Sequence, residues 1–141
     1  MTPVGSTPSP ESEQDPAMIS SVSPFFIVRD LAMATGFYAD RLGFTVAFQF
    51  PEGSPFFAIV ARDEVSLHLK CVGVDPIPNS TRHADARWDA YFAVADPDAL
   101  FAELSERGTE FAQPLRDTDD GLRGFEVEDP DGHVLFFGRP R

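Results

Sequence analysis

The sequence predicts an α+β fold in which one βαβββ unit occurs twice. Two stretches carry the same series of signals: an apolar strand, a helix-capping Asp, a helix that ends at glycine, and further apolar strands. The first helix follows the tetrapeptide V-R-D-L at 28–31, and the second follows V-A-D-P at 94–97. A repeat of this length predicts two supersecondary units that share one core. We expect their strands to form a cup of curved sheet.

The first unit is expected over residues 19–72 and begins with a strand over 21–28. Asp30 is a suitable N-cap because its side chain can accept a hydrogen bond from the first turn of a helix. The apolar residues that follow recur at helical spacing as far as about Leu42, which predicts an amphipathic helix. Gly43 then suits the left-handed conformation at which helices often end.

Three strands are expected to complete the first unit, over residues 44–50, 56–61 and 65–71. Every second residue of the first of these is a large apolar one, which predicts a strand with these side chains on one face: Phe44, Val46, Phe48 and Phe50. The other two strands flank a short polar turn and are expected to pair as a hairpin.

A linker over 73–87, with prolines and no periodicity, separates the first unit from a second unit over 88–141. The Asp-Pro pair at 96–97 predicts a helix start, because proline suits the first helical position. The other expected elements are a strand over 88–94, a helix end near Arg107, a short strand near Phe111, and a hairpin of strands over 122–128 and 134–138. We expect residues 129–132 to form a turn and the adjacent His133 to be exposed to solvent.

The composition excludes several classes of protein. With 43% hydrophobic residues and 14 Phe the chain can build a core, whereas the proline-rich, acidic residues 1–18 are expected to form a disordered tail. No apolar run is long enough to cross a bilayer. The single Cys71 cannot form an internal disulfide and no secretion signal is evident, so we expect a cytoplasmic protein without a membrane partner.

Negative charge is concentrated in the second half of the chain. The formal net charge is -12, and residues 84–131 hold fourteen acidic against four basic residues, compared with five against four in residues 22–71. A nucleic-acid partner is therefore not expected, because its phosphates would be repelled. A cationic small molecule would be attracted. Acidity that serves only solubility is an alternative explanation of the same charge.

Three motifs resemble the glyoxalase/bleomycin resistance protein/dioxygenase superfamily, whose fold is called the vicinal-oxygen-chelate fold. The motifs are V-R-D-L at 28–31, F-Y-x-D-x-L-G-F at 37–44 and D-P-D-G-H at 129–133. The resemblance extends over residues 22–138. Within the superfamily the chain looks most similar to the bleomycin-binding resistance proteins, through S-P-F at 23–25 and the stretch at 91–100.

That resemblance implies a homodimer that binds a hydrophobic, planar or cationic small molecule, such as an antibiotic, without modifying it and without a cofactor. It places Phe48, Phe57 and Tyr91 among the aromatic residues that line the ligand groove. The family often carries a tryptophan in the loop before the penultimate strand, where this chain has Gly121. Either this chain lacks that stacking partner for a flat ligand, or Trp88 supplies it from another position.

The resemblance also locates the positions that bind a metal in metal-dependent members of the family. They correspond here to Ser23, His68, Asp89 and Phe136. Serine is a poor ligand and phenylalanine is none, so we expect neither a metal nor catalytic residues. His68, Asp89 and Phe136 are instead expected to line the ligand site, and a histidine satisfied within the sheet is the alternative for His68. The alternative function is a glyoxalase-like lyase or isomerase with an atypical metal site.

Overall fold

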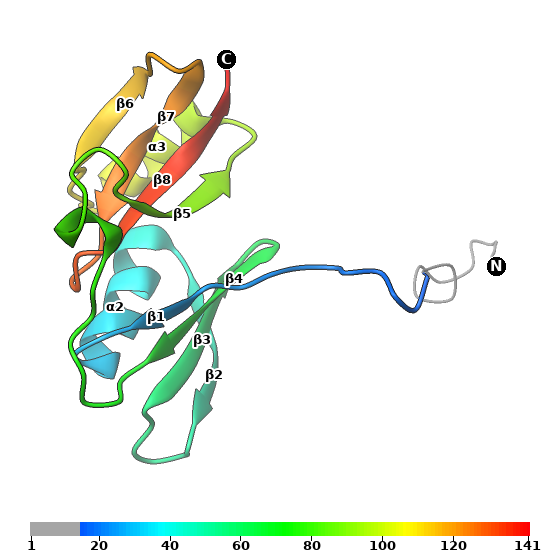
Figure 1. The fold of residues 1–141 in the computed structure, drawn as a ribbon, viewed down its shortest axis with the longest axis vertical. Helices are drawn as coiled ribbons and strands as arrows, with labels where there is room; N and C mark the ends of the chain where they lie inside the picture. Colours follow the sequence, from blue (N-terminus) through cyan, green and yellow to red (C-terminus); the bar gives the residue numbers. More distant parts are fainter. Residues whose placement is uncertain (1–14) are drawn as a thin grey trace.

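The computed structural model describes residues 15–141, and Figure 1 shows two βαβββ units, one above the other. The first unit comprises β1 (Phe25–Ile27), α2 (Leu31–Leu42), β2 (Thr45–Phe50), β3 (Phe57–Arg62) and β4 (Val65–Lys70). The second comprises β5 (Trp88–Ala93), α3 (Pro97–Glu106), β6 (Gln113–Asp117), β7 (Leu122–Glu128) and β8 (Val134–Pro140). This element order confirms the predicted α+β fold with a repeated unit.

The connection between the units contains one short 3-10 helix, η1 (Asn79–Thr81).

Most of the predicted tail, residues 1–14, lies outside the described residues. Residues 15–22 are exposed, and the segment that leads into β1 extends away from both units (Figure 1). Within residues 15–141 no helix is long and apolar enough to span a membrane.

Each unit forms its own four-stranded sheet, ordered β1-β4-β3-β2 in the first unit and β5-β8-β7-β6 in the second. The first strand of each sheet pairs in parallel with the last, and the remaining pairs are antiparallel. The helix of each unit packs against its own sheet. Both sheets stay open, so each has two edge strands and one face that its own helix does not cover.

The first helix forms where its local signals predict it. Asp30 accepts a hydrogen bond from the backbone N–H of Met33 at 2.9 Å, and Gly43 ends α2 with φ at 74°. The stripe expected to face the core is buried, including Leu31, Ala34, Tyr38 and Leu42. Capping and periodicity act over a few residues, which explains why they could be predicted from the sequence.

One prediction for β2 is wrong: its apolar side chains do not share a face. The pairing with β3 is irregular between Val46 and Phe48, so an extra residue is inserted at that point. Val46 lies opposite the fully buried Val60, whereas Phe48 lies opposite Ile59, which points to the other side of the sheet. Because successive strand residues alternate, one inserted residue moves every later side chain to the opposite face.

A buried polar network joins the two units and corrects the prediction that His133 is exposed. His133 is 5% exposed and stacks on Phe26, with ring centroids 4.2 Å apart. Its Nδ1 lies 2.8 Å from Oδ2 of Asp129, which also accepts a hydrogen bond from the hydroxyl of Tyr38 at 2.8 Å. The turn after β7 is therefore part of the interior, because it packs against the first unit.

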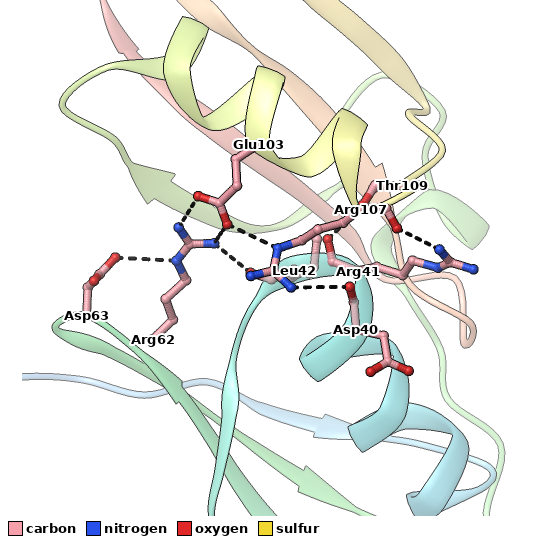
Figure 2. A network of polar contacts seen from close by, with 8 residues as sticks. All are labelled: Asp40, Arg41, Leu42, Arg62, Asp63, Glu103, Arg107 and Thr109. Carbon is pink, nitrogen blue, oxygen red and sulfur yellow. Dashed lines mark hydrogen bonds and ion pairs between the residues drawn. The ribbon is translucent and has the colours of Figure 1, made fainter.

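A second polar network joins the end of α2 to α3 (Figure 2). Arg62 donates two hydrogen bonds to the carboxylate of Glu103, at 2.7 and 2.9 Å, and a third to the Leu42 carbonyl at 2.8 Å. Arg107 also donates to Glu103, at 3.1 Å, and Thr109 donates to the Arg41 carbonyl at 2.6 Å. These donors satisfy carbonyls in the last turn of α2, where the helix has no partners of its own.

We expect E103Q to lower the free energy of unfolding by about 1 kcal/mol at pH 7, since the neutral side chain loses two charge-assisted contacts at a half-exposed site. Hydrogen bonding from Arg62 holds the pKa of the Glu103 carboxyl below its usual value. The stabilisation is therefore present above the unfolded-state pKa of about 4.3 and is lost as the pH falls through the folded-state pKa.

Urea denaturation of the wild type and E103Q at pH 7 and pH 3 measures this difference. It should be present at pH 7 and absent at pH 3. E106Q is a matched control, because Glu106 is exposed near the end of the same helix and its substitution should have little effect. A difference that persists at pH 3, or an equal loss in E106Q, would contradict the assigned role of Glu103.

Candidate ligand-binding site

The uncovered face of the first sheet carries a cluster of aromatic side chains. Strand register places Phe25 beside His68, and Phe50 beside Phe57, on the side opposite α2. The Phe57 ring lies 6.1 Å from the Phe48 ring and 6.3 Å from the Phe25 ring, measured between centroids. We call these five residues the aromatic face. It includes three of the side chains that the sequence predicted for the ligand site: Phe48, Phe57 and His68.

Much of the aromatic face is open to solvent. Phe25 is 60% exposed, Phe48 49% and Phe50 54%. Large apolar side chains that gather on one surface usually mark a binding surface, because leaving them in water costs free energy. Phe25 and Phe50 were not predicted as site residues. Side-chain alternation along the strands could have identified them, because it places them on the same face as His68 and Phe57.

His68 lies at the floor of the aromatic face, between two phenylalanine rings. Its ring centroid is 4.4 Å from that of Phe25 and 5.5 Å from that of Phe57. Its Nδ1 is buried and has no hydrogen-bond partner among the described residues. A buried polar atom without a partner is costly, so a ligand group that reached Nδ1 would gain a hydrogen bond there.

A basic side chain borders the same face. The Nζ atom of Lys70 lies 5.6 Å from the centroid of the Phe25 ring. This distance is within the range of a cation–π contact. The face is therefore bordered by one positive charge at this edge, and its rings can take a flat group by stacking.

The corresponding face of the second sheet is filled by its own side chains. Phe136 is 1% exposed and stacks on Trp88, with ring centroids 4.1 Å apart and planes 20° from parallel. Tyr91 lies beside both rings, with its centroid 5.5 Å from that of Phe136 and 6.2 Å from that of Trp88. The structure thus brings together the predicted residues Trp88, Tyr91 and Phe136. Tyr91 remains 45% exposed, whereas Phe136 does not reach solvent.

Two glycines allow Phe136 to lie flat on the second sheet. A Cβ atom at Gly124 would stand 2.5 Å from the Phe136 ring, and one at Gly138 would stand 2.6 Å from it. Both distances are shorter than real contacts, so a larger residue at either position would displace the ring. The absence of side chains at these two positions explains how an aromatic ring fits beneath Trp88.

A carboxylate that was not predicted as a site residue holds the indole. Trp88 Nε1 donates to Oε2 of Glu126 at 2.7 Å, and Arg87 donates to the other carboxylate oxygen through Nε at 3.1 Å and through its terminal nitrogen. Glu126 alternates with the core residues Phe125 and Val127 along β7, and this pattern is the signal that places it on the opposite face.

Both carboxylate oxygens of Asp89 are engaged by backbone groups of the second unit and of the connection that leads into it. Its Oδ1 accepts a hydrogen bond from the backbone of Asn79 at 3.0 Å, and its Oδ2 accepts one from the backbone of Val134 at 2.9 Å. The β5–β8 register is irregular between Trp88 and Ala90, where Asp89 lies. The structure uses Asp89 to tie the η1 connection to β5 and β8. It forms no hydrogen bond with His68 among the described residues.

Comparison with known proteins assigns the chain to a family. The profile of the Glyoxalase/Bleomycin resistance protein/Dioxygenase superfamily matches residues 19–137, most of the chain. The chain belongs to this superfamily. A search among curated proteins finds no match.

Several solved structures resemble the chain over most of its length. TnmS3, an antibiotic binding protein from Streptomyces sp. CB03234, is 27% identical with a TM-score of 0.60, over 88% of this chain and 99% of TnmS3. A bleomycin-binding protein from Streptomyces verticillus, complexed with copper(II)-bleomycin, is 26% identical with a TM-score of 0.61, over 88% and 100% of the two chains. TioX from Micromonospora sp. ML1 is 22% identical with a TM-score of 0.66, over 86% and 100%, which shows the shared fold.

The residues at the metal positions of this superfamily do not fit a metal in this chain. The Oγ of Ser23 is hydrogen-bonded to that of Ser66 at 2.8 Å, the Asp89 oxygens hold backbone groups, and Phe136 has no ligand atom. Only His68 has a free ligand nitrogen. Elsewhere in residues 15–141, no three His, Cys, Asp or Glu side chains gather as a metal site would require.

Proposed function

We propose that this superfamily member binds a hydrophobic, planar or cationic small molecule on the aromatic face, without a metal and without modifying it. The biological role we propose is sequestration of an antibiotic in the cytoplasm. Binding would be stoichiometric, so affinity and protein concentration would determine protection. A planar aromatic group on the ligand would stack on the exposed phenylalanine rings, and a polar group would reach His68.

The open state of the aromatic face is the observation that carries this proposal. The second sheet covers its own face with Trp88 and Phe136, whereas the first sheet leaves Phe25, Phe48 and Phe50 half exposed. A protein that only needed a stable fold would gain by covering these rings. Two of the similar structures are an antibiotic binding protein and a bleomycin-binding protein, which supports a small-molecule ligand for this chain.

We propose further that the protein is a homodimer. Each sheet leaves edge strands unpaired, and the described part of the chain exposes apolar residues beside β1, including Ile19 at 89% and Val22 at 91%. A second copy that covered such surfaces would protect them from water and from unspecific pairing. Light scattering coupled to size-exclusion chromatography should report twice the mass of 15.5 kDa, and a monomer would contradict this part of the proposal.

Isothermal titration with copper(II)-bleomycin and with the planar dye acridine orange tests the proposed binding. F48A and F57A should each weaken binding of an accepted probe about tenfold, because each removes one stacking ring. M33A is the control: Met33 is 61% exposed on α2, away from the aromatic face, and its substitution should leave affinity unchanged. Failure of both probes to bind, or equal affinity in all three variants, would overturn the proposal.

A further inference from the structure

A cleft lies between the two units, on a part of the surface that contains none of the predicted site residues. Its volume is about 630 Å³, and it is open on one side. The tip of the β3–β4 hairpin (residues 62–65) forms one wall, and residues from the end of β5 and along α3 (within 92–104) form the other. We call it the interunit cleft. Its volume is in the range of sites that bind small organic molecules.

The floor of the interunit cleft is apolar and belongs to the shared core. It is formed by side chains that are at most 7% exposed: Leu42, Phe44, Phe92, Leu104 and Phe137. The wall contributed by the second unit carries small side chains, among them Ala95 and Ala99. Small residues above an apolar floor leave room for the hydrocarbon part of a ligand, which would gain free energy by leaving water.

The rim of the same cleft carries an excess of negative charge. Four carboxylates line it (Asp63, Glu64, Asp96 and Glu103), together with a single cationic side chain, Arg62. Arg62 is already engaged, because it forms a two-pronged ion pair with Glu103 and its Nε lies 3.5 Å from Oδ2 of Asp63. This leaves Glu64 and Asp96 without a cationic partner among the described residues of the rim. Asp63, with its side chain 86% exposed, and Glu64 stand at the tip of the hairpin. A positive group at this rim would be attracted, and an anion would be repelled.

We propose that the interunit cleft is a second ligand site, which takes an amphipathic organic cation. The apolar body of the ligand lies on the phenylalanine floor, and its ammonium group lies beside Asp63 and Glu64. The charged side chain that borders the aromatic face is instead Lys70, so the two sites differ in the charge around them. The proposal does not depend on the function proposed for the aromatic face.

Three probes with the same apolar body and different head groups test the charge preference. They are 4-phenylbutylamine, 4-phenylbutanol and 4-phenylbutyrate, added to the ¹⁵N-labelled full chain and followed by amide chemical shifts. The amine should bind most tightly and the carboxylate most weakly. The amides that shift should be those of the cleft, such as Val65, Ala95 and Leu100, and not those of His68 or Phe57.

Two variants test the location independently. A99L fills the cleft from a helix position that tolerates leucine, and it should abolish binding of the amine. D63N/E64Q removes two rim charges and should weaken binding of the amine about fivefold to tenfold while leaving that of the alcohol unchanged. Asparagine suits position 63, where φ is 52°, because it tolerates the left-handed region.

The matched control is D119N/E110Q, which removes the same net charge at exposed positions outside the cleft and should bind the amine as the wild type does. Three outcomes would overturn the proposal: shifts confined to the aromatic face, equal affinity for the amine and the carboxylate, or no shifts with millimolar amine. F57A serves as the second control, since it should impair the aromatic face and leave the cleft unaffected.

Discussion

D129A is expected to lower the free energy of unfolding by about 3–4 kcal/mol, because it removes a buried carboxylate from a network whose donors would remain. Asp129 is 4% exposed and accepts hydrogen bonds from the Tyr38 hydroxyl, from the backbone of Asp131 and His133, and from the His133 ring. These contacts join the turn after β7 to α2. Urea denaturation at pH 7 measures the loss.

D119A is the matched control for this prediction, because Asp119 is exposed and its removal should change stability by less than about 0.5 kcal/mol. Y38F should have an intermediate effect of about 1–2 kcal/mol, since it removes one donor and leaves the carboxylate three others. Equal stability of D129A and D119A would show that the network does not hold the units together.

The same network predicts a loss of stability at alkaline pH. Burial, and secondarily the charge of Asp129, raise the pKa of Tyr38 well above its ordinary value. The neutral phenol is therefore favoured in the folded state. Its contribution is complete below the unfolded-state pKa of about 10 and is lost as the pH rises above that value. The stability of Y38F should depend less on pH in this alkaline range than that of the wild type.

F136A is expected to destabilise the protein by about 3–4 kcal/mol, because it leaves a cavity beneath Trp88 in a site that cannot collapse. The strands on either side are hydrogen-bonded to β8, and Gly124 and Gly138 have no side chains to fill the space. Trp88 is the single tryptophan of the chain, so its emission should shift to longer wavelength as water reaches the indole. Fluorescence and urea denaturation measure the two effects.

F50A is the control for F136A because it removes the same ring from an exposed position. Phe50 is 54% exposed and contacts Phe56 edge-on, so the substitution should cost less than about 1 kcal/mol and leave the Trp88 emission unchanged. A small effect of F136A, comparable with that of F50A, would mean that the second sheet can open its face. The contrast between an open first face and a filled second face would then not hold.

Local signals in the sequence predicted the elements of the fold. Asp30 and Asp96 cap the two helices, and Gly43 ends the first, as expected. The repeat predicted two units with the same order of strands and helix, and the motifs predicted the superfamily. Both predictions are confirmed. These signals could be read because caps, turns and side-chain alternation depend on residues a few positions apart.

The candidate site could be predicted only in part. Phe48, Phe57 and His68 were expected in the ligand site, and they do lie together on one open face. Whether they bind a ligand remains a prediction. The role of Glu126 as the partner of Trp88 was missed, because its partners lie 38 and 39 positions away and no local pattern relates them. The irregularity in β2 was missed as well, since only the pairing with β3 reveals it.

The sequence by itself determined the elements, their order and the superfamily, because those depend on local backbone preferences and on a repeated motif. Only the tertiary structure decided that His133 is buried and that Phe136 is covered while Phe48 stays open. Burial is the sum of contacts from distant parts of the chain: Tyr38 and Asp129, which bond directly, are 91 positions apart. A local sequence pattern indicates whether a side chain is apolar and which side of its element it takes, but the residues it contacts depend on the tertiary structure.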